Sequence, residues 1–282
     1  MILLWSSIKV ELYKAVHNRW LWIAVLIGSA IASINVLENI QRMYTYGYAA
    51  SGIGGNYCGL SLFIHWIAVG GTSMGFRILY FVWPILVSMP FGWSYCQERR
   101  SGVYDQIVLR RNHMIYFVSK YIAVFVSGGI ALALPVFLNL MVNALICPAL
   151  IPNVNDFLAM VFDGNFLSQI YYTNPWLYSL IWCGMEFLWG GTAACLCFVV
   201  GAKPRLQVIV ILTPFVMLVA LDVLCAVLLN YGHCHLALSP LNLAAGISAN
   251  QNPEWLMFLE IGVLIAISFL IGRWQVIKHE LV

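Results

Sequence analysis

The chain has 282 residues, of which 62% are hydrophobic and only 9% are charged, and its formal net charge is +3. Because soluble domains carry about 25% charged residues, this composition excludes a soluble globular protein and indicates an integral membrane protein. No stretch has the size and polarity of a separate soluble domain, so we expect residues 1–282 to fold as a single transmembrane domain.

Six apolar stretches are long enough to cross a bilayer as helices, which takes about 20 mostly apolar residues. They are residues 20–38, 77–96, 116–146, 177–200, 206–230 and 255–272. Within them, Pro84, Pro90, Pro135 and Pro214 mark sites where a helix can bend. The expected fold class is therefore all-α, a polytopic membrane protein of six transmembrane helices with both termini on one side.

The basic residues predict the orientation, because cytoplasmic loops carry an excess of Lys and Arg. With the N-terminus in the cytoplasm, only Arg42 and Arg77 of the 14 basic residues face outward. The inward-facing residues are Lys9, Lys14, Arg19, Arg99, Arg100, Arg110, Arg111, Lys120, Lys203, Arg205, Arg273 and Lys278. We therefore predict a multi-pass protein of the cell membrane with both termini in the cytoplasm.

Residues 3–16 precede the first predicted span. A helix there would carry one apolar face, made of Trp5, Ile8, Leu12 and Val16. This pattern is typical of an amphipathic helix lying in the membrane interface, here the cytoplasmic one. The alternative is a frayed extension of the first span.

The predicted outer loops contain apolar segments that are too short to span a bilayer. Residues 60–71 (LSLFIHWIAVGG) suit a re-entrant or interfacial segment, and residues 236–247 (LALSPLNLAAGI) suit short helices that dip back toward the membrane. Cys58, Cys147 and Cys234 lie near the outer ends of spans, and the sequence leaves open whether two of them form a disulfide.

The sequence lacks the motifs of the common nucleotide, zinc and hydrolase sites. It contains no GxxxxGK[ST] loop, no HExxH, no GxSxG and no zinc-ligand spacing. His233, Cys234 and His235 are consecutive, and three successive residues of a regular helix cannot all face one ion. We therefore expect no catalytic residue, no metal and no cofactor held by this chain itself.

Three acidic residues, Glu186, Asp222 and Glu260, lie within the predicted spans. Carboxylates inside a membrane are costly and usually face a cavity, a partner or the bundle interior. They could line an outward-opening path for a cationic substrate, or each could be protonated or hydrogen-bonded to a neighbouring helix. We expect no cation inside a span beside them, and Arg77 is the nearest candidate partner. The residues that flank Glu186 at helical spacing, and that could stack on a ligand or pack between helices, are Trp182 and Trp189.

The most strongly charged part of the chain lies between the second and third spans. Its charged residues are Glu98, Arg99, Arg100, Asp105, Arg110, Arg111 and Lys120. A charged hairpin between two spans sits in water, and its basic excess places it in the cytoplasm. A cytoplasmic partner can bind the hairpin there. The alternative is a basic loop whose sole role is to determine the orientation of the chain in the membrane.

At this hairpin the chain resembles the permease of type-2 ABC exporters. The family carries an acid, a basic residue, a Gly, an amphipathic turn and a Lys at the start of the third span. The matching residues are Glu98, Arg99, Gly102, the turn from Val103 to Leu109, Arg110 and Lys120. The N-terminal helix with Glu11, Lys14 and Arg19 resembles the family as well. One departure is that the Thr often found after the Gly is Val103 here.

The resemblance implies a permease subunit that exports a hydrophobic or cationic peptide, a drug or a lipid. Two permeases, either two copies or two relatives, would pair, and each would dock on a separate ATP-binding subunit that holds ATP and Mg. Docking would use the coupling segment, residues 98–115. Its assigned residues are Glu98, Arg99, Gly102, Val103, Asp105, Ile107, Arg110 and Arg111. Membrane lipids are the other expected partners, and no nucleic acid is expected.

Two other functions were weighed. A proton-coupled secondary transporter would use Glu186 or Asp222 as a proton relay, but such folds often show inverted repeats, which this sequence lacks. An intramembrane enzyme would need a paired catalytic signature, and the sequence contains none.

Overall fold

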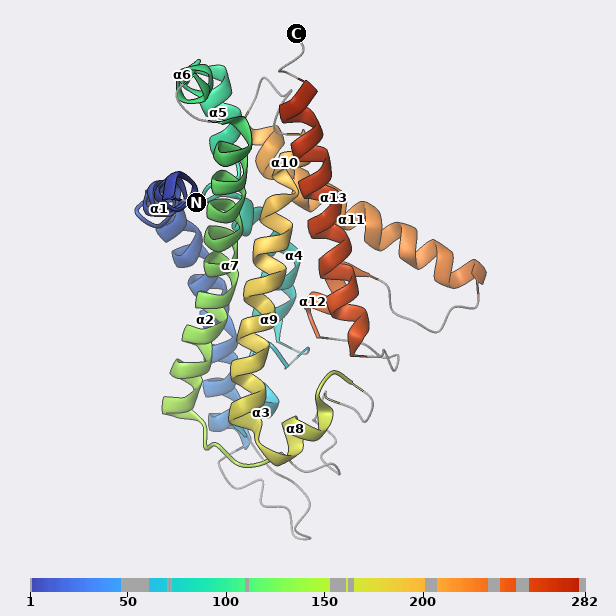
Figure 1. The fold of residues 1–282 in the computed structure, drawn as a ribbon. Coiled ribbons are helices and arrows are strands. Elements are labelled where there is room, and N and C mark those ends of the chain that lie inside the picture. Colours follow the sequence, from blue (N-terminus) through green and yellow to red (C-terminus); the bar gives the residue numbers. More distant parts are fainter. Residues whose placement is uncertain are drawn as a thin grey trace.

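A computed structural model describes residues 2–46, 61–69, 71, 73–109, 112–152, 161, 165–200, 207–232, 239–246 and 254–278. Over these residues the chain is all-α, with thirteen helices and no strand, and most of the long helices lie side by side in an elongated bundle, from which residues 207–232 run obliquely outward (Figure 1). The segments long and apolar enough to cross a membrane are α2 (Arg19–Tyr46), α7 (His113–Ile146), α9 (Pro175–Cys195) with α10 (Cys197–Val200), α11 (Gln207–Gly232) and α13 (Trp255–Lys278).

The remaining helices are shorter. They are α1 (Ile2–Val16), α3 (Leu62–His65), α4 (Met74–Ser88), α5 (Ser94–Arg100), α6 (Val103–Val108), α8 (Ser168–Thr173) and α12 (Pro240–Ala244). Several helices begin where a polar side chain accepts a hydrogen bond from a backbone N–H of the first turn, which satisfies an otherwise unpaired donor. These capping residues are Ser73 for α4, Asn112 for α7, Asn174 for α9 and Ser239 for α12.

The second predicted span, residues 77–96, is divided in the structure. Helix α4 ends at Ser88, two positions before Pro90, and a turn separates it from α5. Met89 still has helical dihedrals, but Pro90 has no N–H to donate to the carbonyl of Leu86, so the helical hydrogen bonding is interrupted there. The 15 residues of α4 extend about 22 Å, less than the roughly 30 Å of a hydrocarbon core. The described residues thus contain five full-length spans, and the sixth is not confirmed.

The first span is longer than predicted. We expected residues 20–38, but α2 continues through the polar sequence ENIQRMYTY to Tyr46. Asn39, in this polar extension, is only 1% exposed because it points into the bundle. The polar residues therefore extend the helix inside the protein and do not start a loop at Glu38.

Helices α7 and α9 run antiparallel along the middle of the bundle (Figure 1). A Cβ atom placed on Gly190 of α9 would lie 2.7 Å from the carbonyl oxygen of Gly128 on α7, and one on Gly128 would lie 2.3 Å from the Cβ of Ala194. Both distances are too short for a side chain. Small residues at this crossing allow the two backbones to touch, as is common between membrane helices.

Helix α1 does not join the long bundle. It is seen almost end-on in Figure 1, crosswise to α2 and α7. Ile8 and Ala15 are buried, whereas Trp5 is 62% exposed. The crosswise placement fits an interfacial helix, and of the predicted apolar face Ile8 is buried and Leu12 and Val16 are partly buried, whereas Trp5 is exposed.

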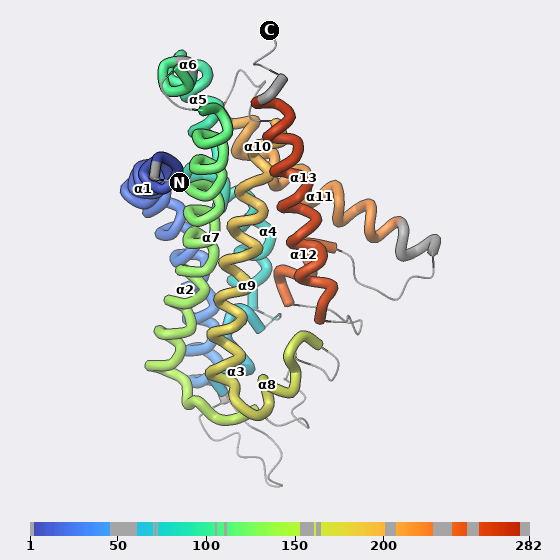
Figure 2. The backbone as a smooth tube through the Cα atoms, viewed as in Figure 1, coloured from blue at the N-terminus to red at the C-terminus, as the bar shows by residue number. Residues whose placement is uncertain are grey.

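The two ends of the bundle differ in charge. Figure 2 shows α1, α5, α6, the start of α7 and the end of α13 toward one end, and α3 and α8 at the other. The described basic residues on the first set of segments, with the start of α2, are Lys9, Lys14, Arg19, Arg99, Arg100, Lys120, Arg273 and Lys278. We call this the basic end. Arg42 and Arg77 lie toward the opposite end, and Lys203 and Arg205 lie outside the described residues.

Candidate functional site

At the basic end, the connection between α4 and α7 forms two short helices, α5 and α6, which we call the hairpin. Gly102 joins them with a φ of +72°, a left-handed conformation that strains any residue with a side chain. The predicted turn from Val103 to Leu109 is helical over Val103–Val108. The glycine of the predicted motif therefore has a definite role, since it allows the chain to reverse between α5 and α6.

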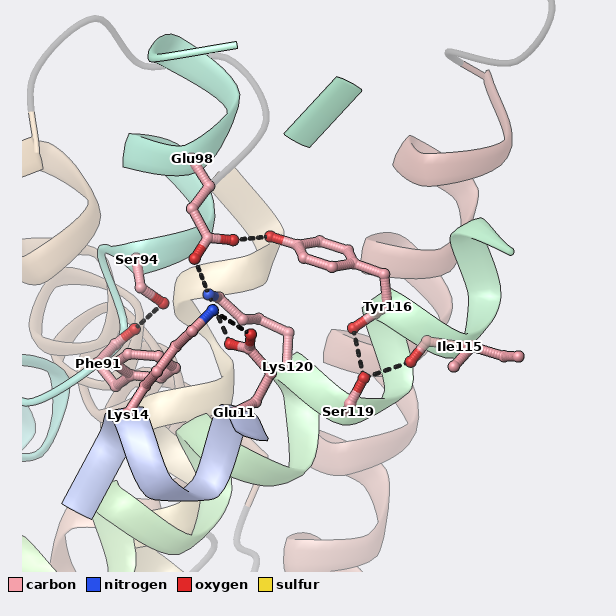
Figure 3. A network of polar contacts seen from close by, with 9 residues as sticks. All are labelled: Glu11, Lys14, Phe91, Ser94, Glu98, Ile115, Tyr116, Ser119 and Lys120. Carbon is pink, nitrogen blue, oxygen red and sulfur yellow. Dashed lines mark hydrogen bonds and ion pairs between the residues drawn. The ribbon is translucent and has the colours of Figure 1, made fainter. Parts of the chain in front are cut away.

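Lys120 lies at the centre of a polar network that joins the hairpin to two other helices (Figure 3). Its side chain is fully buried, and its Nζ donates to Glu98 Oε1 at 2.6 Å and to Glu11 Oε2 at 2.9 Å. We call Lys120, Glu11 and Glu98 the Lys120 triad. Lys120 belongs to α7, Glu11 to α1 and Glu98 to α5. The ammonium group of Lys120 therefore connects three separate helices. Removing one partner of a buried ion pair typically costs about 3–5 kcal/mol, so the triad holds these helices firmly in place.

The α1 end of the network contains a second lysine. Lys14 Nζ donates to Glu11 Oε1 at 2.7 Å, but the Lys14 side chain is 45% exposed. Burial raises the pKa of Glu11, but the charge of Lys120 and the hydrogen bonds from both lysines outweigh burial, so the pKa lies below its ordinary value. Glu11 is therefore ionised at neutral pH and offers Lys120 a full negative charge.

Aromatic side chains enclose the ammonium group. Lys120 Nζ lies 4.6 Å from the ring centre of Phe91, close enough for a cation–π interaction, and Tyr116 donates its hydroxyl to Glu98. Glu98 thus accepts hydrogen bonds on both of its carboxylate oxygens. These contacts compensate the charges that the triad removes from water.

Arg99, the next residue of the predicted motif, also contacts the chain itself. Its guanidinium carbon lies 5.8 Å and 5.4 Å from the ring centres of Tyr95 and Tyr104. Tyr104 belongs to α6, so Arg99 of α5 links the two helices of the hairpin. Glu98 and Arg99 therefore set the shape and attachment of the hairpin.

The outward side of the hairpin carries two exposed apolar side chains among polar ones such as Arg100, Ser101 and Gln106. Val103 is 39% exposed, and Leu109, just after α6, is 87% exposed. Ile107 is partly buried. The members of the predicted coupling set that lie outside the described residues are the side chain of Asp105 and all of Arg110 and Arg111.

A groove of about 490 Å³ lies between α1, α6 and the start of α7. Val10 and Lys14 line it from α1, and Ile107 and Leu109 line it from the hairpin. Glu11, a member of the Lys120 triad, is also part of its lining. Whatever occupies the groove would therefore contact the network that holds the hairpin.

The predicted path residues of α9 lie together inside the bundle. Glu186 is fully buried, and its Oε1 accepts hydrogen bonds from the hydroxyl of Tyr80 on α4 and from Trp182 Nε1 at 3.1 Å. Trp189 is 1% exposed. Among the described residues, neither Glu186 Oε2 nor Trp189 Nε1 has a hydrogen-bond partner.

The other two predicted path residues lie on different helices. Asp222 on α11 accepts a hydrogen bond from the hydroxyl of Ser239, the residue that caps α12. Glu260 on α13 is partly buried. Within the described parts of the chain, no hydrogen bond or ion pair joins these two acids to Glu186. That all five residues line one substrate path stays a prediction.

Among the described residues, no cation inside a span forms an ion pair with Glu186, Asp222 or Glu260, but one span does contain a buried cation. Lys120 lies within α7 and is fully buried, because Glu11 and Glu98 neutralise it. The sequence places Lys120 at the cytoplasmic start of a span but does not indicate that its side chain is buried. Arg77, the partner that we suggested for the buried acids, is exposed on α4.

Sequence reasoning also missed a cluster of buried asparagines at the opposite end. Asn39 donates to Asn143 Oδ1 at 2.9 Å, and Asn35 and Asn39 donate to the carbonyl of His65 at 3.1 and 3.2 Å. These bonds hold residues 62–69, part of the apolar segment 60–71 that we predict to be re-entrant or interfacial, inside the bundle between α2 and α7. Asn35 and Asn39 are four positions apart, so they share one helix face, and this spacing was the available signal.

His65 makes a further contact in this cluster. Arg42 donates to His65 Nδ1 at 2.8 Å, so this nitrogen must be an unprotonated acceptor. Burial and the charge of Arg42 lower the pKa of His65 to about 4. His65 is therefore neutral at physiological pH.

The remaining cysteine and histidine predictions concern possible cross-links and metals. Cys147 is a buried free thiol, whereas Cys58, Cys234 and the neighbouring His233 and His235 lie outside the described residues. In the part of the chain that is described, no three His, Cys, Asp or Glu side chains gather to hold a metal ion.

No protein-family model and no curated protein sequence matches this chain.

Proposed function

We propose that this chain is the membrane-spanning permease subunit of an ABC exporter, driven by ATP that a separate subunit hydrolyses. The observation that carries this proposal is the Lys120 triad, which ties the hairpin to α1 and to the beginning of α7. Because a buried ion pair resists separation, a push on the hairpin would move α7 and would not be absorbed by a loose loop. A membrane helix that is moved in this way can open or close a transport path.

The ATP-binding subunit would dock on the outward side of the hairpin. Leu109 and Val103 present apolar side chains at the basic end, where a water-soluble partner can reach them. The neighbouring groove of about 490 Å³ between α1 and α6 would receive a projecting element of that subunit. In this arrangement Glu98 and Arg99 hold the hairpin in shape, while Val103, Ile107 and Leu109 meet the partner.

The proposed orientation places the basic end in the cytoplasm, as the excess of Lys and Arg there favours. Helix α4, together with the turn that follows it, would serve as a short sixth span, so both termini would be cytoplasmic. Residues 62–69 and α12 would dip into the membrane from the outer side. A second permease, either another copy or a relative, would complete the transport path.

The proposed cargo is a hydrophobic or cationic peptide, a drug or a lipid. The acidic residues Glu186, Asp222 and Glu260 favour a cationic peptide if they face the path. Neither ATP nor Mg would bind to this chain, because its sequence contains no phosphate-binding loop.

Transport in inside-out membrane vesicles tests the proposal. The Glu98→Ala variant, prepared with its partner subunit, is expected to reach the membrane at the wild-type level but to lose at least tenfold in ATP-dependent uptake of cargo. Glu254→Ala is a matched control, because Glu254 is an exposed acid at the start of the segment that leads into α13, away from the hairpin. Wild-type uptake by the Glu98→Ala variant would contradict the assigned role of the hairpin.

A second candidate function, proton-coupled secondary transport, is favoured by one observation, the buried carboxyl group of Glu186. Uptake that follows a proton gradient and needs no ATP would replace our proposal with this one.

A further inference from the structure

The carboxyl group of Glu186 has surroundings that suit a neutral acid. Glu186 is 0% exposed, and Tyr80 and Trp182, which donate to its Oε1, are 6% and 2% exposed. Among the described residues it takes part in no ion pair, in contrast to the buried carboxylate of Glu11. Burying a charge without a counter-charge costs far more than two hydrogen bonds return.

The ionisable groups around Glu186 do not supply the missing positive charge. Tyr80 faces it from α4, and Cys183 lies nearly one turn away on α9. Both are neutral or become negative when they lose a proton, so each disfavours a second negative charge nearby.

The second carboxyl oxygen, Oε2, is buried and has no hydrogen-bond partner among the described residues. One turn along the same interface, the indole N–H groups of Trp83 on α4 and Trp189 on α9 are also buried without partners. One carboxyl oxygen and two indole N–H groups without hydrogen-bond partners therefore lie at this contact between α4 and α9, all on buried side chains.

The enclosure limits what can bind. A hard metal ion takes six or more oxygen ligands, and Glu186 contributes the single carboxyl group at this contact. An organic cation needs open volume, whereas Glu186, Trp83 and Trp189 are each at most 1% exposed. A proton requires neither a set of six oxygen ligands nor open volume.

We infer that Glu186, with Tyr80 and Trp182, forms a proton-binding site between α4 and α9, and that Glu186 carries the proton at neutral pH. The bound proton leaves a neutral acid that can remain in the packed contact. Water reaching the contact would favour the carboxylate and release the proton. Opening of the α4–α9 interface is thus linked to proton release, whether or not an ATP-binding subunit docks on the hairpin.

Infrared spectroscopy of the purified full chain in detergent at pH 7 tests this inference, because a protonated carboxyl group has a carbonyl stretch distinct from that of a carboxylate. We expect a protonated-acid band in the wild type that shifts in heavy water and is lost in Glu186→Gln. Glu11→Gln should keep the band, since Glu11 is already ionised by its lysine partners.

A second variant covers the possibility that Glu186→Gln fails to fold. Tyr80→Phe removes one hydrogen bond to the carboxyl group and should shift the frequency of the same band without abolishing it. Absence of the band from the wild type at pH 7, or its persistence in folded Glu186→Gln, would overturn the inference. Neither result depends on transport or on ATP, so failure here is separate from failure of the proposed function.

Discussion

Lys120 Nζ and Glu98 Oε1 lie 2.6 Å apart, although 22 positions separate the two residues in the sequence. The contact crosses from the beginning of α7 to α5, and Glu11 extends it to α1. A charge buried at such a junction is tolerated because both of its partners are negative. The hairpin is thereby attached to α1 and α7, as the proposed transmission of movement into the membrane helices requires.

The buried lysine of this attachment should matter far more than the exposed one. We expect Lys120→Met to lower the free energy of unfolding by about 3–5 kcal/mol, because it removes the lysine partner of Glu98 and leaves Glu11 with only the half-exposed Lys14. Lys14→Met removes a lysine that also pairs with Glu11, but its 45% exposed side chain makes the expected loss about 1 kcal/mol or less. Unfolding of both variants in detergent measures the difference, and equal losses would show that the triad is not a strong constraint.

The same contacts predict a loss of stability in acid. The pKa of Glu11 is lowered in the folded chain, so its contribution is fully present above its ordinary value of about 4.5 and is lost as the pH falls through the folded value. Stability measured below pH 4.5 should therefore decrease with acidification, and Glu11→Gln should show a smaller decrease. An identical acid profile for the variant would mean that Glu11 makes no charge-dependent contribution.

His65 predicts a second pH effect in a higher window. Its pKa falls from 6.5 to about 4 on folding, so its contribution is complete above pH 6.5 and is lost as the pH drops toward 4. The corresponding loss in the free energy of unfolding is on the order of 3 kcal/mol. His65→Asn keeps an acceptor for Arg42 but cannot titrate, so its stability should be nearly constant between pH 6.5 and 5. If the free energy of unfolding of the variant changed with pH as steeply as that of the wild type, the effect would belong to another titrating group.

The close crossing of α7 and α9 can be tested with two glycines of one helix. Gly190→Ala would place a methyl group 2.7 Å from the Gly128 carbonyl oxygen, so we expect a loss of about 1–3 kcal/mol in stability. At Gly184 no atom lies within 4 Å of an added Cβ. Gly184→Ala should be neutral or stabilising, by up to about 1 kcal/mol, because Ala favours the helix. Similar effects of the two substitutions would argue against the tight backbone contact.

Composition and hydropathy were sufficient to predict the all-α membrane fold and the approximate positions of the long helices. The third and fourth predicted spans begin within three residues of α7 and α9. The second span was wrong in extent, since the apolar run continues across Pro90 although the helix ends at Ser88. Hydropathy measures only how apolar a run is, whereas the missing N–H of Pro90 interrupts the helical hydrogen bonding.

The candidate site was less accessible from the sequence, because its contacts are long-range. Glu98, Arg99 and Gly102 were identified by the resemblance of one charged segment to the motif of a known family. The pairing of Lys120 with Glu11, however, joins residues 109 positions apart, and no local pattern indicates which acid a buried lysine will meet. Glu186 and Trp182 share a helix face and were expected to be near each other, but Tyr80 comes from another helix and was not identified.

The proposed function depends most directly on the existence of an ATP-binding partner at the hairpin. The decisive measurement is affinity purification of the tagged chain from its native membrane in mild detergent, with every co-purified protein identified by mass. We predict a stoichiometric subunit that contains a phosphate-binding loop, reduced about tenfold or more by Leu109→Ser, as expected for an apolar residue at the centre of an interface. Leu145→Ser should retain it, since Leu145 is equally exposed, at 87%, but lies at the other end of α7. A chain that purifies without any ATP-binding subunit would contradict the proposed function.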